Sequence, residues 1–179
     1  GGKGTNAVPV TTAARVNYQK YLESLAATAN NPEQKQMASL ILAKRYRDFD
    51  TDLLKHETTE QAQLEKTQHE ALINTYRSEA VLNYRNPQRV AETLANQEAA
   101  IKTYLAQNGI NGQTADQAIQ KEKSNTLTQI VKRYIVNNQD QQAKAFYEAN
   151  KDGFTGQYVD TVEKQLEDGT KKGEIFRAF

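Results

Sequence analysis

Apolar residues recur along this chain at spacings of three and four, which is the period of an α-helix that buries one face. The first such stripe predicts a helix near residues 12–29 and consists of Tyr18, Tyr21, Leu22 and Leu25. No glycine occurs between Gly4 and Gly109, a gap too long for a β-rich protein, whose tight turns need residues with positive φ. The pattern therefore predicts an all-α fold.

Two prolines within that glycine-free stretch belong to the same dipeptide, Asn-Pro, and predict where helices begin. Asn is a favoured N-cap and Pro is pre-organised for the first helical position, so Pro32 and Pro87 should each start a helix. The residue before a proline is biased out of the α region, which ends the preceding helix. One very long helix is therefore expected over residues 32–84. Thr58 and Thr59 lower helix propensity only slightly, so we expect this helix to be continuous.

The last part of the chain divides into short helices joined by short polar connections. Gly109 is a natural left-handed C-cap, Thr114 with Gln117 has the pattern of a capping box, and Thr155 is the expected cap of a further helix. Such connections make consecutive helices antiparallel neighbours. We expect a compact stack of short antiparallel helices over residues 87–168. Its predicted core consists of Leu94, Ile101, Leu127, Ile130, Val131, Tyr134, Phe146, Tyr147, Val162 and Leu166.

The predicted elements divide the chain into four segments. Gly169 and Gly173 are expected to loosen the chain after the last helix of the stack. The final residues include Ile175, Phe176 and Phe179, whereas a finished domain usually turns polar at its end, so we expect a fragment of a longer polypeptide. The segments are a flexible tail over 1–10, a helical hairpin with the long helix over 11–86, the helical stack over 87–168 and a truncated tail over 169–179.

The long helix carries apolar side chains toward its two ends and few in its middle. The middle segment, KHETTEQAQLEKTQHE (residues 55–70), has Leu64 as its only large apolar residue and is expected to be a solvated span. The stripes on either side can pack inside the chain, against the first and third helices, or against a sister subunit or another protein. Both interpretations stay open at this point. The candidate residues for packing against a partner are Leu42, Tyr46, Phe49, Leu53, Ile73, Tyr76 and Tyr84.

Both histidines of the chain lie in the polar span, together with four glutamates. Helical rotation places His56 and His69 about 140° apart around the axis, so they cannot share a metal ion within one straight helix. A His56–Glu60 pair needs further ligands from another helix. The segment also supplies no apolar wall that would shift a carboxylate pKa. We therefore predict no catalytic residue, no metal site and no cofactor, and we expect that the protein is not an enzyme.

Composition and charge narrow the function classes further. Hydrophobic residues make up 37% of the chain, compared with about 45–50% in typical globular domains, so we expect an elongated chain or one whose apolar stripes are covered by partners. A net charge of +1 gives no overall reason to expect nucleic acid or an acidic membrane surface. The segment KRYRDFD (44–50) mixes basic and aromatic residues, a pattern found in nucleic-acid sites, but neighbouring aspartates neutralise it. The sequence contains no cysteine and no apolar run long enough to span a bilayer.

Two stretches, residues 84–112 and 123–174, contain the motifs NPQRVAETLANQEAAI and AKAFYEANKDGFTG. They resemble a helical segment of large bacteriophage and prophage virion proteins, which are internal virion (DNA-ejection) or tail-associated proteins. Some of these proteins carry a lytic transglycosylase domain elsewhere in the polypeptide. The matching residues cap and pack helices, so the resemblance assigns no catalytic residue.

The resemblance implies a structural and assembly role in a phage particle. It implies homo-oligomers or contacts with other virion proteins and leaves transient DNA contact open. The sequence itself predicts no stable membrane span. The implied location is the virion, and the host cytoplasm before assembly. Two alternatives remain: a helical-repeat adaptor that binds another protein, and the non-catalytic arm of a larger phage lytic transglycosylase.

Overall fold

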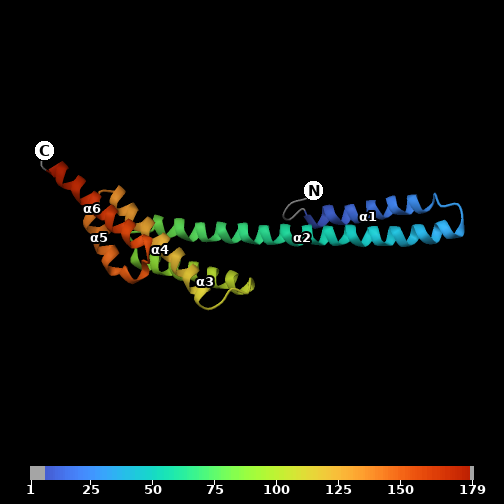
Figure 1. Ribbon diagram of the computed structural model, residues 1–179. Helices are drawn as coiled ribbons and strands as arrows, with labels where there is room; N and C mark the ends of the chain where they lie inside the picture. The colour runs from blue at the N-terminus through green and yellow to red at the C-terminus, as the bar shows by residue number, and fades with distance from the viewer. Residues whose placement is uncertain (1–6, 178–179) are drawn as a thin grey trace. The chain divides into compact units, whose positions relative to one another are not determined.

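The computed structural model describes the backbone of residues 7–177 and the side chains of residues 10–169. As predicted, the fold is all-α: the structure is 87% helical, and the described residues form six α-helices and no strand (Figure 1). A 3₁₀ turn, Lys151–Gly153, precedes the last helix. The helices are α1 (Ala7–Ala26), α2 (Pro32–Leu82), α3 (Pro87–Gln107), α4 (Gln113–Val136), α5 (Asp140–Ala149) and α6 (Gln157–Arg177).

Helix α2 is continuous over 51 residues, in agreement with the expected very long helix. At the two threonines where a break was conceivable, the hydroxyls of Thr58 and Thr59 each donate to the carbonyl four residues earlier, at 2.8 Å. This local bonding lets a β-branched polar residue remain inside a helix. The chain nevertheless divides into two compact units, a hairpin unit (residues 1–68) and a stack unit (residues 69–179).

The Asn-Pro dipeptides start helices by the expected mechanism. The Asn31 side chain accepts a hydrogen bond from the Gln34 N–H at 2.8 Å, and Asn86 accepts one from the Arg89 N–H at 3.1 Å. Each cap satisfies one of the N–H groups that a helix start leaves without an intrahelical partner. At its other end, α3 closes on Gly109, whose φ is +70°.

In the hairpin unit, α1 runs antiparallel beside the first part of α2 (Figure 1). The Tyr18 and Phe49 rings lie 4.0 Å apart between their centroids. Closer to the start of α1, the Arg15 guanidinium donates to Asp50 at 2.6 Å and to Glu57 at 3.0 Å. Among the described side chains of this unit, only those of Thr11 and Leu22 are buried.

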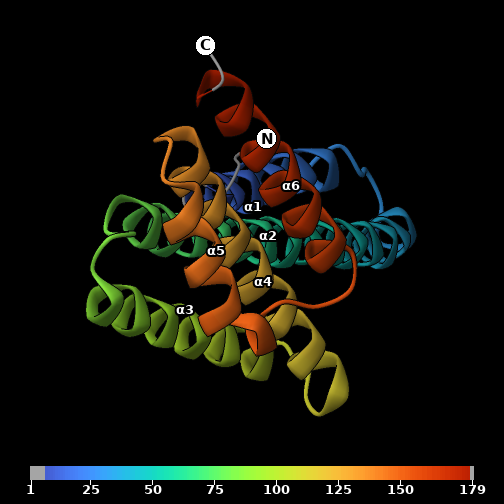
Figure 2. The ribbon, with the colours of Figure 1, turned by 90° about the vertical axis from the view of Figure 1, so that its left-hand side faces the viewer.

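In the stack unit, α4 is the central helix and packs against α3, α5 and α6 (Figure 2). Two apolar clusters fill the space between these helices and the end of α2. The smaller cluster consists of Ile73, Ile101, Leu105 and Ile119. The larger cluster consists of Ala80, Tyr84, Val90, Leu127, Ile130, Val131, Tyr134, Ala143, Tyr147, Phe154 and Val162.

The helix boundaries differ from the sequence-based ones at both ends of the chain. Helix α1 begins at Ala7, so residues 7–10 are helical and not part of a flexible tail. Pro9 is tolerated there because the first N–H groups of a helix have no intrahelical acceptor. Helix α6 continues to Arg177, so most of the predicted tail over 169–179 is helical. Residues 1–6 and 178–179 lie outside the described part.

Gly169 was expected to loosen the chain, but it lies inside α6. A Cβ at this position would lie 3.0 Å from the Asp140 Oδ1 atom and 3.4 Å from a methyl carbon of Ile135. The glycine therefore allows α6 to pack closely against the turn between α4 and α5. A glycine inside a helix costs only about 1 kcal/mol relative to alanine, a penalty too small to end α6 by itself.

The predicted capping box at Thr114 is wrong. Helix α4 begins at Gln113, one residue earlier, and its N-cap is Gly112 with φ of +62°. Thr114 is thus the second helical residue, and no side chain caps this helix end. The left-handed conformation of Gly112 decides the start, because it turns the chain into the helix before Thr114 is reached.

Candidate interaction surfaces

All ten predicted core residues lie in the stack unit, in or against its two clusters. Ile101 belongs to the smaller cluster, and Leu94, Phe146 and Leu166 are half-buried against the larger one. The other six are buried members of the larger cluster: Leu127, Ile130, Val131, Tyr134, Tyr147 and Val162.

The tyrosines of this core have hydrogen-bond partners for their hydroxyl groups. The Tyr134 hydroxyl donates to the Tyr84 carbonyl at 2.7 Å, and the Tyr147 hydroxyl donates to Glu163 at 3.0 Å. Burial and the bond to Glu163 raise the pKa of Tyr147 to about 12. Burial also raises the pKa of Tyr134 above its usual value. These phenols are structural donors that stay protonated near neutral pH.

The downstream half of the candidate partner stripe is packed inside the chain. Ile73 is 5% exposed and Tyr84 is 8% exposed, and both are members of the clusters described above. The Tyr84 hydroxyl also donates to Gln139 at 2.8 Å. Tyr76 is half-buried. The expectation that Ile73 and Tyr84 contact a partner is therefore wrong, because the neighbouring helices of the stack already cover them.

The upstream half of the stripe faces α1 but is only half covered. Leu42, Tyr46, Phe49 and Leu53 are all half-buried, and Phe49 contacts Tyr18. A two-helix hairpin gives each helix a single neighbour, so a side chain at the seam stays open on its flank. This half of the stripe combines intramolecular packing with an exposed edge.

One flank of the hairpin seam forms a shallow apolar groove of about 360 Å³. Gln19, Glu23 and Ser39 supply the polar part of its lining. The other lining residues are Leu22 and Ala26 from α1 and Leu42, Ala43 and Tyr46 from α2. Small side chains at such a position allow another helix to approach closely.

A second groove, of about 550 Å³, lies in the stack unit between α3 and α5, with α4 beneath it. Polar residues, among them Gln97, Glu98 and Lys123, also line it. Mixed apolar and polar linings are typical of sites that receive an amphipathic helix. The apolar lining includes Val90, Leu94, Ile101, Ile119, Tyr134 and Phe146.

His69 packs against an aromatic ring, a contact that the polar sequence around it did not predict. Its ring stacks on the Tyr104 ring, with centroids 3.9 Å apart and planes 6° from parallel. Desolvation by this packing lowers the pKa of His69, and the charges of Glu70 and Glu122 oppose the shift. Tyr104 comes from α3, so a reading of the α2 sequence alone misses the contact.

The pocket beside His69, of about 460 Å³, contains charged residues that sequence reasoning also missed. The Arg77 guanidinium donates to Glu122 at 2.5 Å and to Asn74 at 2.6 Å. Lys121 lines the same pocket. Positive and negative charges are thus mixed here, so the pocket does not favour a ligand of one charge sign.

A buried polar pair lies on the apolar face of α3 and α4. The Gln97 side chain is 2% exposed, and its Oε1 atom lies 3.0 Å from the Thr126 hydroxyl. The sequence holds one signal for this pair, because Gln97 falls on the same helical stripe as Leu94 and Ile101. A polar residue at a core position predicts a buried hydrogen-bond partner.

Neither a metal site nor a membrane span is found in the part of the chain that the structure describes. No three His, Asp or Glu side chains among these residues lie close enough together to hold a metal ion. No helix within residues 7–177 combines the length and apolar composition that crossing a bilayer requires. No protein-family model, curated protein or solved structure matches the chain significantly.

Proposed function

We propose that this protein is a structural, non-enzymatic component of a bacteriophage virion, of the internal (DNA-ejection) or tail-associated class. In this role it assembles with sister subunits or with other virion proteins. The observation that carries the proposal is the poorly covered hairpin unit, in which Thr11 and Leu22 are the only buried residues among the described side chains. A helical pair with so small a core is expected to be stabilised by a partner surface.

Exposed apolar side chains on the hairpin support the assembly role. Large exposed apolar side chains on a folded chain often indicate contact surfaces. Most of those among the described residues belong to this unit: Val10, Val16, Tyr21, Met37, Leu40, Ile41 and Leu54. The phage assignment is supported by the resemblance of residues 84–112 and 123–174 to virion proteins.

Sedimentation equilibrium over a wide concentration range, combined with negative-stain imaging, tests the assembly role. We expect defined oligomers whose population rises with concentration. A strict monomer at the highest concentration would overturn the proposal.

The genes beside the parent reading frame test the virion assignment separately. Neighbouring capsid, portal or tail genes support it. A position among metabolic genes, away from any phage genes, would overturn it.

A helical adaptor is the second candidate function, and the groove between α3 and α5 favours it. Selection of amphipathic helical peptides against the protein tests this alternative. We expect binders that lose affinity when Ala145, which lines the groove, is replaced by Trp. Binders that tolerate this substitution would argue against the groove as a recognition site.

A further inference from the structure

A second seam of residues runs along the flank of α2, next to the seam that faces α1. It is spaced by four, three and four residues, which is the heptad spacing of helices that pack side by side. Leu54 is 57% exposed, and the Asp50 side chain is 46% exposed although it pairs with Arg15. Ala43 and Arg47 are exposed. The flank seam consists of Ala43, Arg47, Asp50 and Leu54.

The flank seam is self-complementary when read in the opposite direction. The point midway between Asp48 and Phe49 is equally far from Ala43 and Leu54, and equally far from Arg47 and Asp50. A two-fold axis through this point would therefore place a small residue opposite a large one and a basic residue opposite an acidic one. A two-fold interface requires this reciprocity, because residue i contacts residue j and residue j contacts residue i.

We propose that the hairpin unit binds a second copy of this chain through the flank seam, with the two α2 helices antiparallel. Leu54 of each chain enters the apolar groove beside Ala43 of the other chain. Arg47 of each chain lies against Asp50 of the other, where it adds a cation to the Arg15–Asp50 pair. The result is a four-helix arrangement of two hairpins, which covers the flank that a single hairpin leaves exposed.

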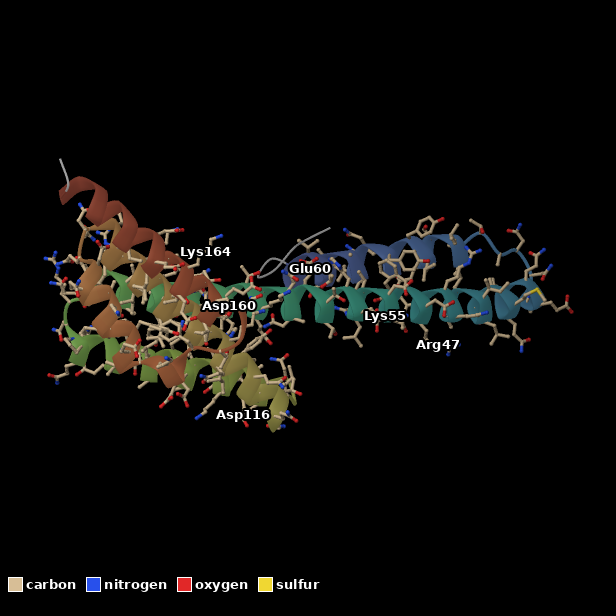
Figure 3. All side chains as sticks on the ribbon, turned by 60° about the vertical axis from the view of Figure 1, so that its left-hand side comes forward. Arg47, Lys55, Glu60, Asp116, Asp160 and Lys164 are labelled. Carbon is tan, nitrogen blue, oxygen red and sulfur yellow. The ribbon has the colours of Figure 1, made fainter. Side chains whose placement is uncertain are left out.

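Three features favour a second copy over an unrelated partner. The groove and the side chain that fills it belong to the same flank, so one surface provides both halves of the contact. The charges on this flank pair with each other under the same two-fold axis. In addition, Arg47 is exposed and projects from α2 away from α1 (Figure 3). This inference rests on the proposed assembly function and names the contact through which assembly begins.

Cysteine cross-linking tests the register, because the native sequence has no cysteine. A disulfide requires Cα atoms within about 7 Å, whereas positions 43 and 54 of one helix are about 16 Å apart. Under mild oxidation, the Ala43→Cys/Leu54→Cys variant should therefore form a disulfide-linked dimer and no disulfide within one chain. We expect the dimer to be the major species.

The matched control carries the same spacing on the opposite flank of α2. Ile41 and Asp52 each precede a seam position by two residues, which is about 200° of helical rotation, and both are exposed. The Ile41→Cys/Asp52→Cys variant should remain monomeric on a denaturing gel. The single variants Ala43→Cys and Leu54→Cys should also fail to cross-link, whereas a parallel dimer would link each of them to its own copy.

A second variant tests the energetics without cross-linking. Leu54→Asp places a charge at a position that the proposed interface buries in an apolar groove, and it does so twice per dimer. The substitution should therefore raise the dissociation constant at least about a hundredfold. Leu72→Asp, at another exposed leucine of α2, should leave the dissociation constant unchanged. Circular dichroism of both variants shows whether the helices are retained.

The outcomes separate this proposal from the broader function. Cross-linking at positions 43 and 54 together with the Leu54→Asp loss supports the antiparallel seam. Oligomers that neither cross-link there nor respond to Leu54→Asp overturn the seam but leave the assembly function in place. A monomer at every concentration overturns both.

Discussion

The hairpin unit and the stack unit are both built of helices and share α2, yet they differ in how many neighbours each helix has. In the hairpin unit, α1 packs against the first part of α2, and their seam stays open on its flanks. In the stack unit, α4 has three neighbouring helices, and residues on several of its faces are fully buried. A helix therefore acquires a closed core only when neighbours cover more than one of its sides.

The polar contacts of each unit reflect this difference in coverage. In the hairpin unit, charged contacts such as Arg15 with Asp50 and Glu57 lie beside the seam, where solvent screens them. In the stack unit, polar groups such as Gln97 and Thr126 are buried with partners. An uncovered seam is consistent with a unit that becomes stable on association, whereas the stack has the core of an independently folding domain.

The largest effect is expected when a buried leucine of the stack unit is replaced, and a half-buried leucine of the hairpin unit provides the comparison. Leu127 is 0% exposed, so Leu127→Ala should lower the free energy of unfolding of the stack unit by about 2–5 kcal/mol through lost burial and a cavity. Leu42→Ala, at the half-open hairpin seam, should cost less than about 1.5 kcal/mol. Urea unfolding followed by circular dichroism measures both.

An exposed leucine of the stack unit controls for side-chain size alone. Leu82 is 75% exposed, so Leu82→Ala should change the free energy of unfolding by no more than about 0.5 kcal/mol. Equal losses for Leu127→Ala and Leu42→Ala would contradict the difference between the two units.

An intermediate effect is expected at the buried polar pair of the stack unit. Thr126→Val keeps the shape of the side chain but removes the hydroxyl that faces Gln97 Oε1 at 3.0 Å. A buried acceptor without a donor costs about 1–3 kcal/mol, which urea unfolding would detect. The double variant Gln97→Met/Thr126→Val removes both partners and should be less destabilised than Thr126→Val alone. A double variant that loses the sum of both single effects would show that the pair acts mainly through packing.

Local chemistry in the sequence predicted the fold class and the starts of α2 and α3. Asn31 and Asn86 cap helices as the Asn-Pro dipeptides indicate. After α3, the Ile110 N–H donates to the Leu105 carbonyl at 2.8 Å, which is the bond expected for a helix closed by a left-handed glycine at Gly109. These features depend on residues within one or two turns of each other, so they can be read from one sequence.

Apart from the starts of α1 and α4, the features that the sequence did not predict depend on residues distant along the chain. Gly169 reads as a loosening residue until Asp140 and Ile135 are placed beside it. The α2 stripes could equally pack inside the chain or against a partner. Helical periodicity identifies an apolar face but not the element that covers it. For this reason, the core residues of the stack could be predicted, whereas the coverage of Ile73 and Tyr84 could not.

The smallest expected effect concerns His69. The sequence places this residue in a polar span, but in the stack unit its ring stacks on Tyr104. Its pKa is lowered in the folded state by desolvation, while the nearby carboxylates of Glu70 and Glu122 oppose the shift and Arg77 and Lys121 line the same pocket. The unfolded state therefore binds the proton more tightly than the folded state. The stabilising contribution is complete above the unfolded pKa of about 6.5 and is lost as the pH falls through the lower folded pKa.

A phenylalanine at this position separates titration from packing. His69→Phe keeps an aromatic ring against Tyr104 and removes the titrating group. Between pH 7.5 and pH 5, the free energy of unfolding should therefore fall more for the native protein than for His69→Phe. The difference between these two falls should be smaller than the loss expected for Thr126→Val. Urea unfolding at a series of pH values measures the difference, and NMR titration of the His69 ring locates its pKa. Parallel pH profiles for the two proteins would mean that folding does not lower the pKa of His69. That result would match a histidine in a solvated helix, as the sequence suggests.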